Sequence, residues 1–180
     1  IGEDIVKEKK IKAISFTGGT QTGQKIYKNA SESMKKLSLE MGGKNPAIIF
    51  EDCDYELMME TLVQSSFANQ GQICLCSSRI LVEKQIYKKF KKDFIDAVSA
   101  LRIGDPINDS IQYGAISSTE QLEKIDHYVE LAKKENGKIL LGGNPIKLSG
   151  RCQDGWFYEP TIIEGLNNSS RVNQEEIFGP

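Results

Sequence analysis

A cysteine and a glutamate, each placed close to glycine residues, are the residues of this chain best suited to catalysis. Cys74 follows Gly71 by three residues, and Glu40 lies 34 residues before Cys74 and is followed by Gly42 and Gly43. A thiol can act as a nucleophile, and a carboxylate can remove a proton from the thiol or from water. The glycines leave space for the carboxylate to change rotamer. Together the pair predicts covalent thiol catalysis, although an isolated cysteine is more often a small buried apolar residue.

Four short segments resemble the successive signature motifs of the aldehyde dehydrogenase superfamily, in the same order and at similar spacing. They are residues 16–19 (Phe-Thr-Gly-Gly), 39–46 (Leu-Glu-Met-Gly-Gly-Lys-Asn-Pro), 71–74 (Gly-Gln-Ile-Cys) and 175–180 (Glu-Glu-Ile-Phe-Gly-Pro). Residues 66–76 are most similar to the branch of the family that oxidises 2-aminomuconic semialdehyde. Betaine-type and hydroxymuconic substrates stay open.

The resemblance implies a role for each of the two reactive residues. Cys74 would attack an aldehyde as a thiolate, and the resulting thiohemiacetal would lose hydride to a nicotinamide cofactor and become a thioester. Glu40 would deprotonate the water that hydrolyses this thioester. The backbone N–H of Cys74 would stabilise the oxyanion, together with an asparagine expected upstream of Ile1.

The resemblance also implies that Gly19 contacts the pyrophosphate of the cofactor, which is expected to be NAD, with NADP left open. A strand, a glycine turn and a helix can present backbone N–H groups to a phosphate. Here Gly18, Gly19 and Gly23 do not match the G-x-G-x-x-G motif. As a bare pattern, a tight turn between a strand and a helix is the simpler interpretation.

Two residues near the end of the chain are implied to hold the nicotinamide half of the cofactor. Glu176 would accept hydrogen bonds from the ribose hydroxyls, and Phe178 would contact the ring. Without the resemblance, Glu176 would be interpreted as a capping glutamate before a turn. Gln121 and Lys124 match positions near the cofactor less closely, and Asn69 is expected to help shape the thiol loop.

Composition argues against several other functions. The 180 residues carry a formal net charge of −2 and a pI of about 5.6, so we expect no binding to nucleic acid or to acidic membranes. Apolar runs reach only about four residues, too short for a membrane span. Cys74 and Cys76 are too close for a zinc knuckle, and His127 is the only histidine, so we expect no metal site. Reduced cysteines fit a cytoplasmic enzyme.

Alternating strands and helices predict an α/β fold, with a mostly parallel sheet covered by helices. We expect strands at residues 12–16, 36–40, 47–50, 79–82 and 138–141, helices at 21–30, 55–69, 85–101 and 119–134, and an extended segment at 156–163. The resemblance implies that residues 1–40 are the C-terminal part of an NAD-binding domain. Residues 41–180 would then be the N-terminal two-thirds of a catalytic domain.

Three functional hypotheses follow. The first is NAD-dependent oxidation of a semialdehyde or another small aldehyde by a cytoplasmic homodimer or homotetramer. The second is a relative that transfers the acyl group to coenzyme A, which Glu40 disfavours because such relatives generally lack this carboxylate. The third is a truncated, non-catalytic fragment that keeps the fold. The missing initiator Met and upstream motifs predict a piece of a longer protein, which alone would bind NAD weakly and be inactive.

Overall fold

The computed structural model describes all residues from Ile1 to Pro180. The chain divides into two compact units, Ile1–Gly43 and Lys44–Pro180. The division falls close to the expected boundary between residues 40 and 41. The assignment of the two parts to a cofactor domain and a catalytic domain stays a prediction.

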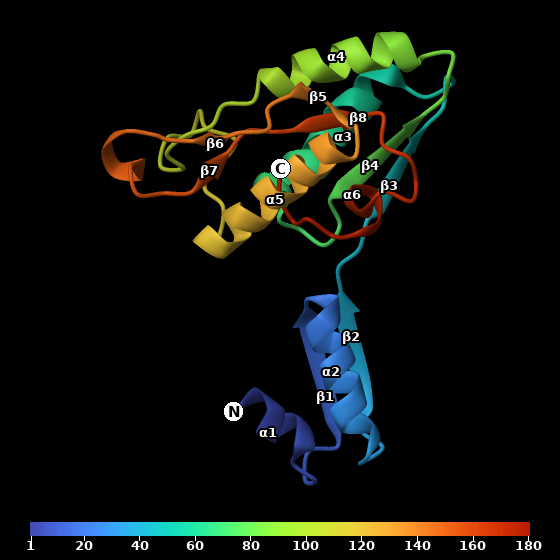
Figure 1. The fold of residues 1–180 in the computed structure, drawn as a ribbon, viewed down its shortest axis with the longest axis vertical. Helices are drawn as coiled ribbons and strands as arrows, with labels where there is room; N and C mark the ends of the chain where they lie inside the picture. Colours follow the sequence, from blue (N-terminus) through green and yellow to red (C-terminus); the bar gives the residue numbers. More distant parts are fainter. The chain divides into compact units, whose positions relative to one another are not determined.

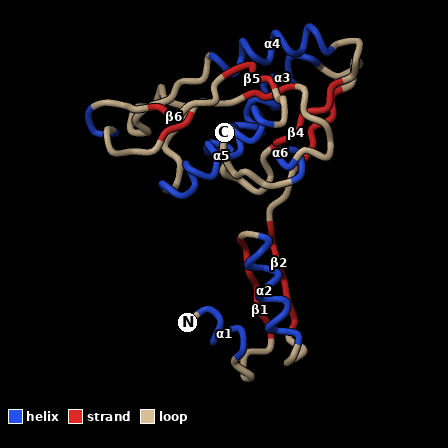
Figure 2. The backbone as a smooth tube through the Cα atoms, viewed as in Figure 1, coloured by secondary structure: helices blue, strands red, loops and turns tan.

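The first unit is a strand–helix–strand crossover preceded by a short helix (Figure 2). Its elements are α1 (Gly2–Lys7), β1 (Ala13–Gly18), α2 (Thr20–Ser31) and β2 (Lys36–Met41). β1 and β2 pair in parallel, with Phe16 opposite Leu39. Gly23 allows α2 to lie close to the strands, since a Cβ at this position would come within 2.2 Å of the Met41 sulfur. The unit therefore has the connection that parallel strands require.

The second unit begins with another parallel pair joined by a helix (Figure 1). Its first elements are β3 (Asn45–Ile49), α3 (Tyr55–Phe67), the 3-10 helix η1 (Ala68–Gly71), β4 (Ser77–Val82) and α4 (Tyr87–Ser99). α3 begins at Tyr55 because the Asp54 side chain accepts a hydrogen bond from the Leu57 N–H at 3.2 Å.

One face of the β3–β4 pair packs against α3 and α4 to form the largest apolar core. Along β3, Ile49 is buried while Ile48 points outward and is exposed, which is the alternation of a strand. The rings of Phe90 and Phe94 on α4 stack with centroids 5.4 Å apart in this core. The other buried members are Leu62, Phe67, Val98 and Tyr113.

The remainder of the second unit adds a long helix and antiparallel strand pairs. Its elements are α5 (Thr119–Lys134), β5 (Lys138–Leu141), β6 (Pro145–Ile146), the 3-10 helix η2 (Gly150–Cys152), β7 (Phe157–Tyr158), β8 (Ile162–Glu164) and α6 (Arg171–Gln174). β5 pairs with β8 and β6 pairs with β7, both antiparallel. The inner face of α5 places Ile125 and Val129 against the fully buried Tyr158.

The predicted α/β class is confirmed by the mixture of helices with parallel strand pairs. α3 ends at Phe67, two residues earlier than expected, because Ala68 leaves the helical conformation with a ψ of 140° and the left-handed Asn69 and Gln70 follow it. The short elements α1, β6 and α6 were not predicted, since two to six residues are too few to show a periodic pattern. None of the helices combines the length and apolar character needed to cross a lipid bilayer.

Candidate active site

Cys74 lies at the corner of a tight turn that exposes it. The N–H of Cys76 donates to the carbonyl of Ile73 at 3.0 Å, so Cys74 and Leu75 occupy the two central positions of the turn. Cys74 is exposed, whereas Cys76 is buried and directs its thiol to the carbonyl of Ala68 at 3.8 Å. The N–H of Cys74 has no acceptor in the chain. The turn therefore presents a nucleophile beside a free hydrogen-bond donor.

The segment that leads into this turn is strained. Asn69, Gln70 and Gly71 have φ values of 48°, 58° and 67°, three left-handed residues in succession. Such conformations cost about 1–2 kcal/mol for each non-glycine residue and cluster at functional sites. The Asn69 amide donates to the Gln72 carbonyl at 3.2 Å, so it shapes the thiol loop as predicted.

Gly71 brings the thiol loop against the end of the chain. A Cβ on Gly71 would lie 2.1 Å from the carbonyl oxygen of Gly179. A Cβ on Gly179 would in turn lie 2.4 Å from the Ile125 side chain in α5. Two of the predicted motif segments, residues 71–74 and 175–180, are therefore in backbone contact within the second unit.

Two glutamines on either side of Gly71 brace the loop and were not among the predicted site residues. The side-chain oxygen of Gln72 accepts from the Ser117 N–H at 3.1 Å. The Gln70 amide, oriented to satisfy both of its polar atoms, accepts from the Gly114 N–H at 2.8 Å and donates to the Ala115 carbonyl at 3.2 Å. Long amide side chains flanking a glycine turn are the sequence signal that would have indicated this role.

Asn45 is a third residue that holds the thiol loop and that was not among the predicted site residues. Its Nδ2 donates to the carbonyl of Cys74 at 2.6 Å and to the carbonyl of Cys76 at 3.1 Å. Asn45 opens β3, opposite Ser77 at the start of β4, so a strand residue fixes the loop that ends where β4 begins. It belongs to the Leu-Glu-Met-Gly-Gly-Lys-Asn-Pro motif that also contains Glu40.

Glu176 offers a carboxylate with no partner in the chain. The neighbouring Glu175 carboxylate accepts hydrogen bonds from the Arg171 guanidinium, at 2.8 and 3.0 Å, and from the Tyr128 hydroxyl. Glu176 is half-buried and makes no comparable hydrogen bond or ion pair. A free, partly desolvated carboxylate is a suitable acceptor for two adjacent hydroxyl groups of a sugar.

Phe178 is held in an unusual conformation by Gln121. Its φ is 63°, and the Gln121 amide nitrogen donates to the carbonyl of Ile177 at 2.9 Å and to that of Phe178 at 2.7 Å. Gln121 thus acts on the backbone of the Glu176–Phe178 segment from the first turn of α5.

The pKa of Lys44 is shifted, and Glu176 is one of the charged groups that influence it. Burial, reinforced by the positive charges of Arg79 and Lys124, lowers the pKa of Lys44 to about 8, and the negative charge of Glu176 partly offsets this effect. Titratable groups shifted by burial together with specific charges concentrate at functional sites.

The first unit contains the other two predicted site residues, Gly19 and Glu40. Gly19 precedes α2 and leaves its N-terminus without a side-chain cap, and no atom approaches the position of a Cβ on Gly19 within 4 Å. Uncapped N–H groups at a helix N-terminus suit a phosphate. Glu40 is exposed on β2, opposite Thr17 of β1.

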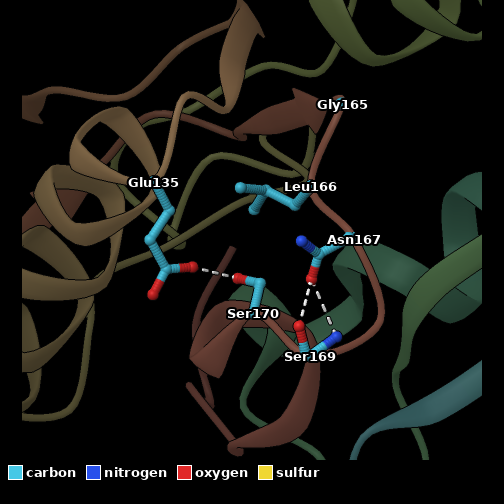
Figure 3. A pocket seen from close by; sticks show the side chains of 6 residues that line it. All are labelled: Glu135, Gly165, Leu166, Asn167, Ser169 and Ser170. Atoms are coloured by element: carbon cyan, nitrogen blue, oxygen red, sulfur yellow. Dashed lines mark hydrogen bonds between the residues drawn. The ribbon is translucent and has the colours of Figure 1, made fainter.

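A polar hollow of about 320 Å³ lies elsewhere in the second unit (Figure 3). The Ser170 hydroxyl donates to Glu135, and the Asn167 side chain accepts from the N–H and hydroxyl of Ser169 at 2.9 and 2.6 Å. Since these groups already satisfy one another, we assign them to the stability of the turn before α6. None of the predicted site residues lines the hollow, which is bounded by Glu135, Gly165, Leu166, Asn167, Ser169 and Ser170.

The second unit thus combines an exposed thiol and a free N–H in an α/β fold. Residues 1–180 match the profile described as "Aldehyde dehydrogenase family", and the chain belongs to that family. It is 45% identical over 182 residues to the 2-aminomuconic semialdehyde dehydrogenase of Mus musculus. It is 42% identical over 180 residues to the D-glyceraldehyde dehydrogenase (NADP(+)) of Picrophilus torridus. All of this chain is covered in both comparisons, but only 37% and 36% of the relatives.

Solved structures agree with the family assignment. The chain superposes on the betaine aldehyde dehydrogenase of Staphylococcus aureus, in its P449M mutant complexed with NAD+, with a TM-score of 0.94 and 39% identity. The match covers 99% of this chain and 36% of that structure. The chain therefore spans little more than a third of the length of these relatives.

Proposed function

We propose that the complete protein carrying this chain oxidises an aldehyde to a carboxylic acid with NAD as the hydride acceptor. The observation that carries the proposal is the exposed Cys74, on a turn whose own N–H is free to bind an oxygen anion. Membership of the aldehyde dehydrogenase family supports it. The relatives named 2-aminomuconic semialdehyde dehydrogenase, at 44–45% identity, make a semialdehyde the favoured substrate.

Cys74 is the nucleophile in this proposal. Its thiolate attacks the aldehyde carbon, a carbon–sulfur bond forms, and the carbonyl oxygen becomes an anion. The Cys74 N–H donates to that oxygen and stabilises the negative charge as it develops, an effect worth about 3–4 kcal/mol for one well-placed donor. Bound NAD supplies the hydride acceptor that allows the thiohemiacetal to become a thioester.

Glu40 serves the second half of the reaction. It removes a proton from water, the hydroxide attacks the thioester, and the carbon–sulfur bond breaks to release the acid and the Cys74 thiolate. A general base of this kind contributes about 10²–10⁴ in rate.

The cofactor contacts are assigned within each unit. Backbone N–H groups at Gly19 and the uncapped start of α2 would bind the pyrophosphate, which fits residues 1–40 as part of an NAD-binding domain. Glu176 would accept hydrogen bonds from the ribose of the nicotinamide half, and Phe178 would contact the ring, which fits residues 41–180 as part of a catalytic domain. The similarity to betaine aldehyde dehydrogenase complexed with NAD+ supports NAD.

The test is NADH production from a semialdehyde by the complete protein and two variants. Cys74→Ala should abolish NADH formation. Glu40→Gln should retain a first burst of NADH but lose steady-state turnover by about 10²–10⁴, because acylation survives and hydrolysis does not. Cys53→Ala, at a half-buried thiol, is the matched control and should keep its activity. Substantial activity in Cys74→Ala would refute the assignment.

A further inference from the structure

The peptide groups around Cys74 are oriented largely by one side chain. The carbonyls of Cys74 and Cys76 both accept from the amide of Asn45, which uses both of its N–H donors on them. These two bonds fix the peptide planes on the C-terminal side of each cysteine. Together they hold Cys76 in place, and the Cys76 N–H in turn holds the carbonyl of Ile73.

The orientation of the Ile73 carbonyl determines where the Cys74 N–H points. In a trans peptide the C=O and the N–H of the same plane point in opposite directions. Because the Ile73 carbonyl is tied inward to the Cys76 N–H, the Cys74 N–H is directed away from the turn, where the chain provides no acceptor. The chain of contacts therefore runs from Asn45 through Cys76 and Ile73 to the Cys74 N–H.

We propose that Asn45 is a positioning residue, which aims the Cys74 N–H at the oxygen anion formed when the thiol attacks. Asn45 touches neither the sulfur nor the substrate in this role. The inference rests on the proposed function for its biological meaning. Its physical content, an N–H held ready for an oxyanion, can be tested without NAD or an aldehyde.

The chemistry requires an amide at position 45. An aspartate has almost the same shape, but its ionised oxygens would face two carbonyl oxygens and repel them. A serine offers one donor in place of two, and an alanine offers none. The loss of alignment should therefore increase from Asn45 through Asn45→Ser to Asn45→Ala, with Asn45→Asp worst at neutral pH.

Two reagents separate alignment from simple access to the thiol. Attack of the Cys74 thiolate on p-nitrophenyl acetate forms a carbon–sulfur bond, passes through an oxygen anion and expels p-nitrophenolate. Attack on iodoacetamide forms a carbon–sulfur bond and expels iodide without any oxygen anion. In the complete protein, acetylation would be followed by the initial burst of p-nitrophenolate, which precedes hydrolysis of the thioester, and alkylation of Cys74 by mass spectrometry.

Asn45→Ala should slow acetylation of Cys74 by about 10–100-fold, since a misplacement of about 1 Å can cost up to about 100-fold in rate. Alkylation should change by less than about threefold, and Asn45→Ser should fall between wild type and Asn45→Ala. The matched control is Asn144→Ala, which removes an exposed amide hydrogen bond of 2.8 Å to Glu159 in the same unit. It should leave both rates unchanged.

Asn45→Asp provides a readout that a purely structural role would not move. Protonation of its carboxyl group, whose ordinary pKa is about 3.9, restores one donor, so its acetylation rate relative to wild type should rise as the pH falls from about 6 to about 4. Equal changes in acetylation and alkylation, or no change in either, would overturn the positioning role. Failure of the proposed function appears separately, as aldehyde oxidation that survives Cys74→Ala.

Discussion

At the scale of single residues, Lys44 shows how the fold perturbs a charge beside the candidate site. Burial first, and then the positive charges of Arg79 and Lys124, lower its pKa from 10.5 to about 8. Between these values the unfolded chain binds a proton that the folded chain has lost. Stability therefore rises with pH across this window, and below pH 8 the unfavourable effect of the buried charge is fully present.

Replacing Lys44 with methionine should remove this pH dependence. We expect the free energy of unfolding of Lys44→Met to exceed that of the wild type at pH 7, with the difference shrinking as the pH rises from about 8 towards 10.5. Urea unfolding at a series of pH values measures it. Lys84→Met, at an exposed lysine, is the control and should follow the wild-type profile. A Lys44→Met profile parallel to wild type would show that Lys44 is not perturbed.

At the scale of elements, the thiol loop depends on a glycine that meets two demands at once. Gly71 has a left-handed φ of 67°, and a Cβ there would also collide with the Gly179 carbonyl. Gly150 has a similar φ of 64° but nothing within 4 Å of its Cβ position. The two positions therefore separate backbone strain from steric collision.

Gly71→Ala should be clearly more damaging than Gly150→Ala. Both should lose about 1–2 kcal/mol of stability through the left-handed conformation. Gly71→Ala should lose about 1–3 kcal/mol more, since overpacking forces the backbone to shift. Urea unfolding of both variants measures the difference, and alkylation of Cys74 reports on the loop. Equal destabilisation would mean that the loop can move away from Gly179 freely.

Elements with strong local signals were predictable from the sequence, whereas the contacts that hold the loop were not. α5 was expected at its observed bounds, and in the structure Ser118 caps it while Ile125 and Val129, at helical spacing, lie in the apolar core. Cys74 stood out from the other three cysteines because it lies in a glycine-containing segment, residues 71–74, that resembles a signature motif of the family. Asn45 did not stand out in the sequence. Its hydrogen bond to the Cys74 carbonyl joins residues 29 positions apart, which come together only when β3 and β4 pair.

At the scale of the whole molecule, the apolar core is distributed unevenly. Val6 and Ala30 are the buried apolar side chains of Ile1–Gly43, whereas Lys44–Pro180 holds three buried clusters. A segment of about 40 residues with so little buried apolar surface lacks the stabilisation that folding requires.

Separate production of the two units should reveal this difference. We expect a peptide of residues 1–43 to show the circular dichroism of an unfolded chain, and residues 44–180 to retain helical signal and unfold cooperatively with heat. Stable helical structure in the 1–43 peptide would show that local propensity, rather than buried surface, maintains the crossover.

The meeting of Gly71 with Gly179 has a consequence for how such a protein can diversify. Main-chain atoms alone form this contact. It therefore fixes the distance between the turn that carries Cys74 and the segment that contains Glu176 and Phe178. Replacing side chains around it, such as the exposed Leu75, can reshape what fits next to the sulfur without altering that spacing. Adding or removing a residue between Gly71 and Cys74 would change the spacing itself, so the turn should tolerate substitutions better than insertions.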